Sequence, residues 1–251
     1  MAGHSHWAQI KRAKGANDAK RGKIFSRMAR EIMIAARAGG ADPAMNPRLR
    51  QAITAAKAES VPKDTIERAI KRGTGELGGE TIEELTYEGY GPGGVALLVE
   101  ATTDNKNRTA AEIRAIFTKN NASLGSPGSV AWMFQRCGLI DVPAAEADEE
   151  STMMAALDAG AEDMSTSGDA FSIRTPVDRL YAVEEALRKL NIAVRSAKIA
   201  AVPSNQTPVT EEKVASQVMA LIEALDDHDD VQNVFSNLEI PDDLMAKLAA
   251  A

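Results

Sequence analysis

The sequence predicts a multidomain α+β protein, in which an N-terminal three-helix basic bundle is followed by two α+β domains and the third domain is inserted into the second. Three observations lead to this prediction. Signals for the start and end of a helix recur within the first 76 residues, and strand and helix patterns alternate after them. The 251 residues also exceed the roughly 100–200 typical of one domain.

The N-terminal helices are delimited by capping residues, proline and glycine. The first is expected at residues 18–38, after a candidate cap at Asn17 and before Gly39–Gly40. A second helix starts at Asn46–Pro47, and a third runs from Pro62 to Gly73. The residues expected to be buried in this bundle include Leu49, Ile53, Ala56, Ile66 and Ile70.

The next segment predicts one β-α-β unit, because its pattern changes from helical to mixed. VALLVEATT is typical of a buried strand, TAAEIRAIFTKNN of a helix and SVAWMF of a second strand. The spacing of Thr109 and Glu112 indicates a capping box at the start of the helix.

A further series of strands and helices predicts the inserted domain. Its strands are expected at GLIDV, FSIRT and AVRSAKIAAV, with helices at STMMAALDAGA and VDRLYAVEEALRKLN. The last helix, EEKVASQVMALIEAL, and the last strand, VQNVFSN, do not suffice for a domain and are expected to complete the preceding one. The predicted domains are therefore 1–76, 77–137 with 203–251, and 138–202.

The charge distribution indicates a nucleic-acid binder. Residues 1–73 carry 16 Lys and Arg against 6 Asp and Glu, whereas residues 74–251 carry 13 against 30. A basic module fused to an acidic body predicts that phosphate is bound by the first domain and repelled by the others.

The N-terminal arm and the first helix hold the candidate binding residues. Rings can stack on exposed bases while cations hold the backbone. The candidate nucleic-acid-binding residues are His4, His6, Trp7, Lys11, Arg12, Lys14, Lys20, Arg21, Lys23, Arg27 and Arg30. Two alternatives stay open: a basic face without a ligand, and an arm that Trp7 anchors on the bundle.

The sequence offers little for catalysis, so we expect no enzyme, no catalytic residue, no cofactor and no small-molecule substrate. Two G-x-G-x-x-G matches, at 73–78 and 89–94, lack the strand-to-helix context of a dinucleotide site. The only histidines are His4, His6 and His228, and the single cysteine, Cys137, is typical of an apolar strand residue.

Membrane partners and export are not expected either. The longest uninterrupted apolar runs are five residues, far below the ~20 that cross a bilayer. The N-terminus lacks the apolar region of a secretory signal, which predicts a cytoplasmic protein.

Two weak metal hypotheses exist, and we predict no metal site from either. Ala2-Gly3-His4 would chelate Cu(II) or Ni(II) once Met1 is removed. The acidic stretch Asp226–Asp230 has ligands that suit Ca²⁺ or Mg²⁺, but we favour a solvated turn between helix and strand.

Several long motifs resemble one protein family. They are MAGHSHWAQIKRAKGANDAKRGKIFSRMAREI, NPRLRQAI, VPKDTIERAIKRGTGE, YEGYGPGGVALLVE, TDNKNRTAAEIR and LGSPGSVAWMF. Over residues 1 to about 140, and more loosely beyond, the chain is similar to the YebC/PmpR family, which includes a mitochondrial translational activator. The resemblance implies a helical N-terminal bundle, two α+β domains with the last inserted in the middle one, and no enzymatic activity.

The family is described in two ways, as DNA-binding transcriptional regulators and as ribosome-associated factors that ease translation through proline runs. The helix expected at 62–72 contains no Asn or Gln, which favours recognition of backbone and shape over reading of bases. We therefore expect a nucleic-acid-binding regulator of gene expression, described as transcriptional, whose partner is DNA or ribosomal RNA. The alternative is a ribosome-binding translation factor that relieves stalling.

Overall fold

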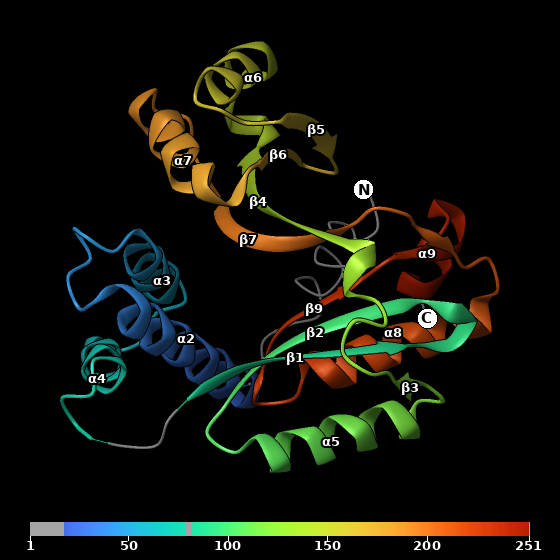
Figure 1. Cartoon of the computed structure of the whole chain (residues 1–251). Helices are drawn as coiled ribbons and strands as arrows, with labels where there is room; N and C mark the ends of the chain where they lie inside the picture. The colour runs from blue at the N-terminus through green and yellow to red at the C-terminus, as the bar shows by residue number, and fades with distance from the viewer. Residues whose placement is uncertain (1–17, 79–81, 251) are drawn as a thin grey trace. The chain divides into compact units, whose positions relative to one another are not determined.

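The computed structural model describes residues 18–78 and 82–250 (Figure 1). These residues divide into two compact units. One holds residues 18–130 with Lys213–Val234, and the other holds Ala131–Glu212 with the residues from Phe235 onward. Each unit therefore combines segments that lie far apart in the sequence.

The first unit begins with the expected helical bundle, α2 (Asp18–Gly39), α3 (Pro47–Ala58) and α4 (Lys63–Gly73). Leu49, Ala56 and Ile66 lie in its core, and Ile53 and Ile70 pack against that core while partly exposed. The expected cap Asn17 lies outside the described residues.

Asn46 and Gly73 hold the three helices together. The Asn46 side chain accepts a hydrogen bond from the Leu49 N–H at 3.0 Å and caps α3. It also donates to the carbonyl oxygens of Ala35, at 2.7 Å, and Gly40, at 2.9 Å. A Cβ on Gly73 would overlap the Met33 carbonyl oxygen of α2, so a glycine at this point permits the close crossing of α2 and α4.

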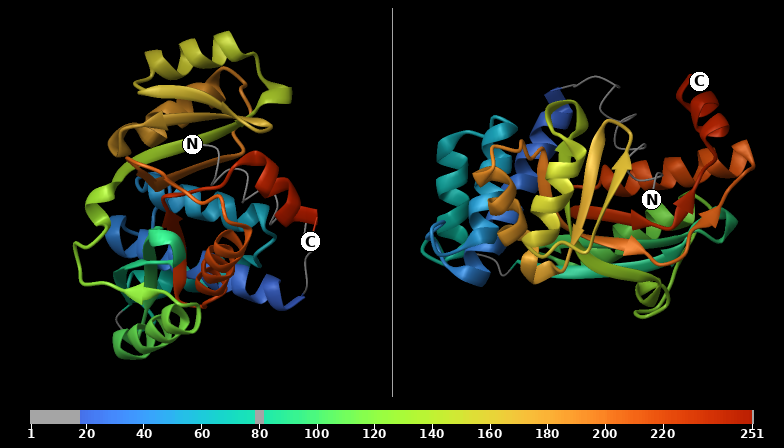
Figure 2. Two further views of the ribbon diagram at one scale, coloured as in Figure 1. Left: turned by 90° about the vertical axis from the view of Figure 1, so that its right-hand side faces the viewer. Right: turned by 90° about the horizontal axis from the view of Figure 1, so that it is seen from above.

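The same unit contains a four-stranded sheet in the order β3-β1-β2-β9. Its strands are β1 (Glu83–Tyr90), β2 (Ala96–Thr103), β3 (Ser123–Leu124) and β9 (Val231–Ser236), with a short 3-10 turn, η1 (Pro92–Gly94), between β1 and β2. β1 pairs antiparallel with both β2 and β3. Although β9 follows β2 by more than a hundred residues in the sequence, the two strands are neighbours (Figure 2).

Helices α5 (Lys106–Lys119) and α8 (Glu212–Asp226) pack near this sheet. A Cβ on Gly89 of β1 would lie 2.5 Å from the Phe117 ring of α5, so the missing side chain makes room for that ring. Leu221 and Leu225 of α8 are fully buried. Residues 227–230 join the end of α8 to the start of β9.

The second unit contains a four-stranded antiparallel sheet in the order β5-β6-β4-β7. Its strands are β4 (Phe134–Pro143), β5 (Asp163–Ser167), β6 (Ala170–Thr175) and β7 (Ser196–Pro203). The helices are α6 (Glu149–Asp158) and α7 (Leu180–Lys189), with 3-10 turns η2 (Ala131–Met133), η3 (Ala144–Glu146) and η4 (Val177–Arg179). Ile140, Ile173, Val183 and Leu187 are among the residues of its core.

The remaining described elements are short. β8 (Thr207–Pro208) pairs in parallel with β10 (Leu238–Glu239), and α9 (Asp242–Ala250) follows. The α+β class, with N-terminal helices before the sheets, is confirmed.

Three sequence-based expectations on elements need correction. SVAWMF is not a strand, because Ala131–Met133 form a 3-10 turn with Trp132 71% exposed. The strand begins at Phe134 and continues through Pro143, so the two expected strands are a single strand, which pairs with β7 from Phe134 to Asp141. The strands β1, β3, β5, β8 and β10 and the helix α9 were not expected. The strand segments are short or rich in polar residues, and partner strands rather than local patterns stabilise them. The helix α9 is short and buries Leu244 and Met245.

The capping box expected at Thr109 is also wrong. Asn105 caps α5 instead by accepting a hydrogen bond from the Arg108 N–H at 3.1 Å, so the helix begins about one turn earlier. Thr109 is fully buried within the helix.

The proposed domain limits 1–76, 77–137 with 203–251, and 138–202 stay a proposal. The limit after 137 falls inside β4. Cys137 is buried in that strand as expected, and burial raises the pKa of its thiol.

Candidate nucleic-acid interface

The candidate binding residues predicted from the sequence fall into three groups. His4, His6, Trp7, Lys11, Arg12 and Lys14 lie outside the described residues, as does the chelating motif Ala2-Gly3-His4. Lys20 and Arg21 belong to the first turn of α2. Lys23, Arg27 and Arg30 project from α2 toward residues 226–230, Asp-Asp-His-Asp-Asp. We call these three cations the basic stripe and residues 226–230 the acidic loop.

Each cation of the basic stripe donates to the acidic loop. Lys23 Nζ donates to the Asp227 carbonyl oxygen at 2.8 Å, and Arg27 Nη2 to the Asp226 carbonyl oxygen at 2.6 Å. The Arg27 guanidinium is also 3.3 Å from Asp226 Oδ1.

Arg30 reaches further along the loop. It donates to the Asp229 carbonyl oxygen and forms an ion pair with Asp230, with 2.9 Å between Nη2 and Oδ1. All three cations are therefore engaged within the protein.

The position of the acidic loop at the end of α8 explains these contacts. The last carbonyl groups of a helix lack partners within it and carry a partial negative charge. The last turn of α8 has no basic residue of its own. Positions 23, 27 and 30 of α2 have the four- and three-residue spacing of one helix face, so a single stripe can supply the missing donors.

Asp230 is the most buried charge of the acidic loop. Its side chain is 3% exposed, and its second carboxylate oxygen accepts from Arg108 Nη2 at 2.9 Å and from Thr109 Oγ1 at 2.6 Å. The Asp230 carbonyl oxygen accepts from the Thr102 N–H of β2 at 2.7 Å. Asp230 thus connects α2, α5 and the sheet.

Electrostatics support an ionised Asp230. Burial alone would raise the pKa of this carboxyl, but hydrogen bonds from Thr109 and Arg108 and the positive charges of Arg30 and Arg108 hold it below the usual value for aspartate. Burial lowers the pKa of the Arg27 guanidinium, while the nearby Asp227 opposes that change.

The expectation of a solvated turn at 226–230 is therefore wrong for its most buried member. Local composition alone gave no sign that α2 and α5 would supply cations to the loop.

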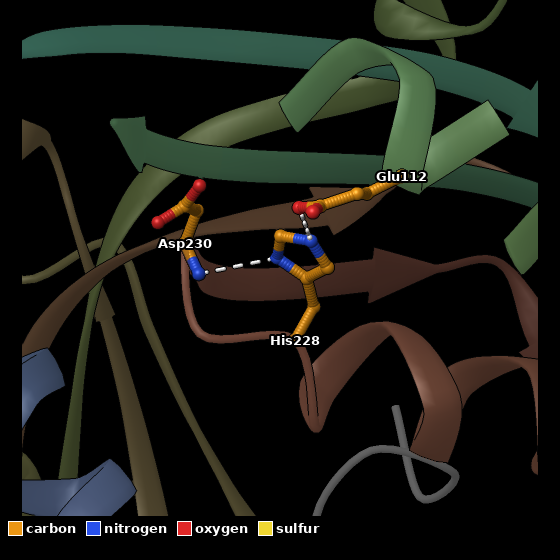
Figure 3. Close-up of side chains that lie close together, drawn as sticks. All are labelled: Glu112, His228 and Asp230. Carbon is orange, nitrogen blue, oxygen red and sulfur yellow. Dashed lines mark hydrogen bonds and ion pairs between the residues drawn. The ribbon is translucent and has the colours of Figure 1, made fainter. Parts of the chain in front are cut away.

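The three side chains Glu112, His228 and Asp230 have the composition of a metal site and lie close together (Figure 3). Their polar atoms are already engaged. His228 Nε2 is 2.9 Å from Glu112 Oε2, and His228 Nδ1 accepts from the Asp230 N–H at 3.1 Å. The Asp230 carboxylate points away from the ring (Figure 3). It pairs with Arg30 and Arg108, whose positive charges oppose a divalent cation. This cluster is better described as part of an ion-pair network.

A second group of cations on the bundle remains open to a ligand. Arg68, Lys71 and Arg72 lie at i, i+3 and i+4 on α4 and form one exposed face, which we call the α4 face. Among the described residues, none of these side chains has a hydrogen-bond or ion-pair partner. The sequence alone predicts this exposed face, because the apolar residues Ile66 and Ala69 occupy the buried face of the same helix and the cations lie at other positions.

Two arginines of the α4 face also line a groove of about 1670 Å³ within the first unit. Arg37 of α2 and residues 73–75 contribute to the same groove, whereas Glu83, Glu84 and Asp104 make part of it acidic. Arg37 donates to the Ile82 carbonyl oxygen at 2.7 Å, so its position is fixed.

The fold and this surface define a multidomain α+β protein with a basic helical N-terminal module. Two family models match the chain. The TACO1/YebC N-terminal domain matches residues 5–76, and the TACO1/YebC second and third domain matches residues 82–238. The chain belongs to the TACO1/YebC family, which confirms the resemblance found in the sequence.

Curated relatives agree over nearly the whole length. A probable transcriptional regulatory protein of Desulfotalea psychrophila is 55% identical over 249 residues, covering 99% of this chain and 100% of the relative. One from Aquifex aeolicus is 49% identical over 248 residues, with 99% and 100% covered.

A solved structure has the same fold. The crystal structure of a conserved hypothetical protein from Aquifex aeolicus is 48% identical, with a TM-score of 0.83 over 90% of this chain and 93% of that one. Among the described residues of the present chain, no helix has the length and apolar character required to span a bilayer.

Proposed function

We propose that this protein is a non-enzymatic regulator of gene expression that binds nucleic acid through its basic helical bundle and N-terminal arm. The names of its curated relatives support a transcriptional regulator. In this proposal, DNA or ribosomal RNA is the partner, the site of action is the cytoplasm, and neither a membrane nor a small-molecule substrate takes part.

The observation that carries the proposal is the α4 face. The chain as a whole has more acids than bases. Arg68, Lys71 and Arg72 nevertheless stand without acidic partners among the described residues. Three cations at helical spacing match the repeated negative charge of a nucleic-acid backbone.

The basic arm adds to this surface in the proposal. Lys11, Arg12, Lys14, Lys20 and Arg21 precede or begin α2, and His4, His6 and Trp7 offer rings for stacking. Lys23, Arg27 and Arg30 belong to the proposed interface as well, but the acidic loop occupies them.

A charge-reversal experiment tests the α4 face. The variant Arg68→Glu with Arg72→Glu should bind a labelled duplex DNA and a labelled structured RNA at least about tenfold more weakly than the wild type, because two phosphate contacts become repulsions. Lys119→Glu with Lys198→Glu is the matched control, since it makes the same charge change at two exposed lysines outside the bundle. Equal binding by the wild type and the α4 variant would contradict this interface.

One observation favours the ribosomal alternative, a translation factor that binds ribosomal RNA and relieves stalling. The sequence of α4, KDTIERAIKRG, has no Asn or Gln with which to read adenine edges in a major groove. Its cations suit backbone and shape recognition, which structured RNA offers. Cosedimentation with ribosomes and binding to a defined promoter separate the two mechanisms.

A further inference from the structure

We propose that the acidic loop is a built-in competitor for nucleic acid, which occupies the basic stripe of α2 and keeps it from phosphate. This inference rests on the proposed nucleic-acid-binding function and concerns its regulation. While the loop contacts the stripe, its three cations are withheld from phosphate, and they become available when the loop leaves them.

The first argument is chemical. The acidic loop offers the basic stripe carbonyl and carboxylate oxygens, and its four aspartates make it a run of negative charge. A nucleic-acid backbone offers anionic oxygens to the same donors. The loop and a phosphate backbone therefore compete for Lys23, Arg27 and Arg30.

The second argument concerns which acids the fold needs. Asp230 is buried and bound by Arg108 and Thr109, so it anchors the loop to α5 whether or not α2 is in contact. Asp227 and Asp229 are exposed, and the stripe donates hydrogen bonds to their main-chain carbonyl groups only. Their two charges strengthen the attraction for the stripe without a visible packing role.

The third argument concerns strength. Lys23 is exposed, and the side chains of Arg27 and its partner Asp226 are 31% and 22% exposed. Arg30 is 23% exposed although its partner Asp230 is only 3% exposed, but Arg108 and Thr109 still bind the Asp230 carboxylate when Arg30 leaves it. Contacts between charges that water reaches are weak and sensitive to salt. Such a contact is exchangeable, whereas a fully buried one would be a permanent part of the fold.

Neutralising the exposed acids tests the proposal. The loop variant Asp227→Asn with Asp229→Asn keeps side-chain size and the main-chain acceptors. We expect it to bind a labelled polyuridylate oligonucleotide about tenfold more tightly than the wild type. The slope of log K against log[salt] should steepen by about 2, because three added contacts contribute roughly 0.7 each on a single strand.

The matched control is Asp158→Asn with Asp163→Asn. It removes the same charge at two exposed aspartates outside the acidic loop, and it should change binding much less. If the control gains as much as the loop variant, the gain reflects net charge alone and the competition model is overturned.

A double-mutant cycle measures the coupling between the stripe and the loop, which a change in net charge alone would not produce. Lys23→Gln with Arg27→Gln should have little effect on binding in the wild type, where the stripe is occupied, but should cancel the gain of the loop variant. Equal losses in both backgrounds would overturn the inference. Urea unfolding of every variant tests whether a change in binding comes from loss of the fold. If the double loop variant is unfolded, Asp229→Asn alone replaces it in the binding measurements.

The outcomes also separate this inference from the function on which it rests. Binding by the wild type without any gain in the loop variant refutes the competitor and leaves the function intact. Binding that appears only in the loop variant supports both. If neither binds DNA or RNA, the proposed function fails and the competitor fails with it.

Discussion

Arg30 of α2 and Asp230, the residue before β9, form an ion pair of 2.9 Å although they are 200 positions apart in the sequence, and the Asp230 side chain is 3% exposed. Arg108 and Thr109 complete the surroundings of the same carboxylate. This contact connects the helical bundle to the first sheet, and it gives the basic stripe a structural role beside the proposed functional one.

Asp230→Ala should therefore destabilise the fold. The substitution removes the buried carboxylate that pairs with Arg30 and Arg108 and accepts a hydrogen bond from Thr109, and we expect a loss of about 2–4 kcal/mol in the free energy of unfolding. Urea unfolding followed by circular dichroism measures it. The exposed neighbour serves as a control, because Asp229→Ala should change the free energy by about 0.5 kcal/mol or less.

Stability should also fall in acid through this residue. The pKa of Asp230 is lower in the folded protein than its unfolded value near 3.9, so its contribution is fully present above that value and disappears as the pH falls through the folded pKa. Urea unfolding between about pH 3 and pH 6 should show a decline that is shallower in Asp230→Asn. Identical pH profiles for the two proteins would contradict the assignment.

Asn46 should matter more than a single helix cap. Asn46→Ala removes the cap of α3 and leaves the Ala35 and Gly40 carbonyl oxygens without their donor, so we expect a loss of about 2 kcal/mol. Asn46→Asp keeps the oxygen that caps α3 but loses the amide donor. Its loss of stability therefore measures the contribution of the two hydrogen bonds to the Ala35 and Gly40 carbonyl oxygens. Thermal and urea melts of the two variants give the comparison, and equal stability of Asn46→Ala and wild type would rule out this role.

Salt dependence should report how many phosphates are neutralised. Five cations of the arm and of the first turn of α2, together with three of the α4 face, give eight proposed contacts when the basic stripe is occupied. The slope of log K against log[salt] should then be about −7 for duplex DNA and about −6 for a single strand. A slope near −1 would refute an electrostatic interface.

Ribosome binding and promoter binding make opposite predictions. If structured RNA is the partner, the protein sediments with ribosomes at low salt and leaves them at high salt. Lys11→Glu with Arg12→Glu should abolish this without lowering the melting temperature, and it should slow translation of a proline-run reporter. A transcriptional mechanism is favoured instead if a defined promoter binds about 10³-fold tighter than scrambled DNA.

Local signals were sufficient for the three helices of the N-terminal bundle and for the family. Asn46–Pro47 and Gly73 predicted helix ends correctly because capping depends on a few adjacent residues. The long N-terminal motifs identified the family, and the family models confirm it. Strands were harder, since β1 is rich in polar residues and its pairing with β2 depends on residues beyond its own segment.

The basic character of the bundle, the acidic character of the body and the line of cations along one side of the first helix can all be read from the amino-acid sequence. Helical spacing and net charge are local properties, so neither requires knowledge of distant residues. How these cations are used depends instead on the folded chain. Lys23, Arg27 and Arg30 meet the end of α8 because β9 joins the sheet beside β2, which brings residues 226–230 to α2. The availability of a charge depends on what the fold places beside it, and so, among the described residues, the α4 face is left open whereas the basic stripe is not.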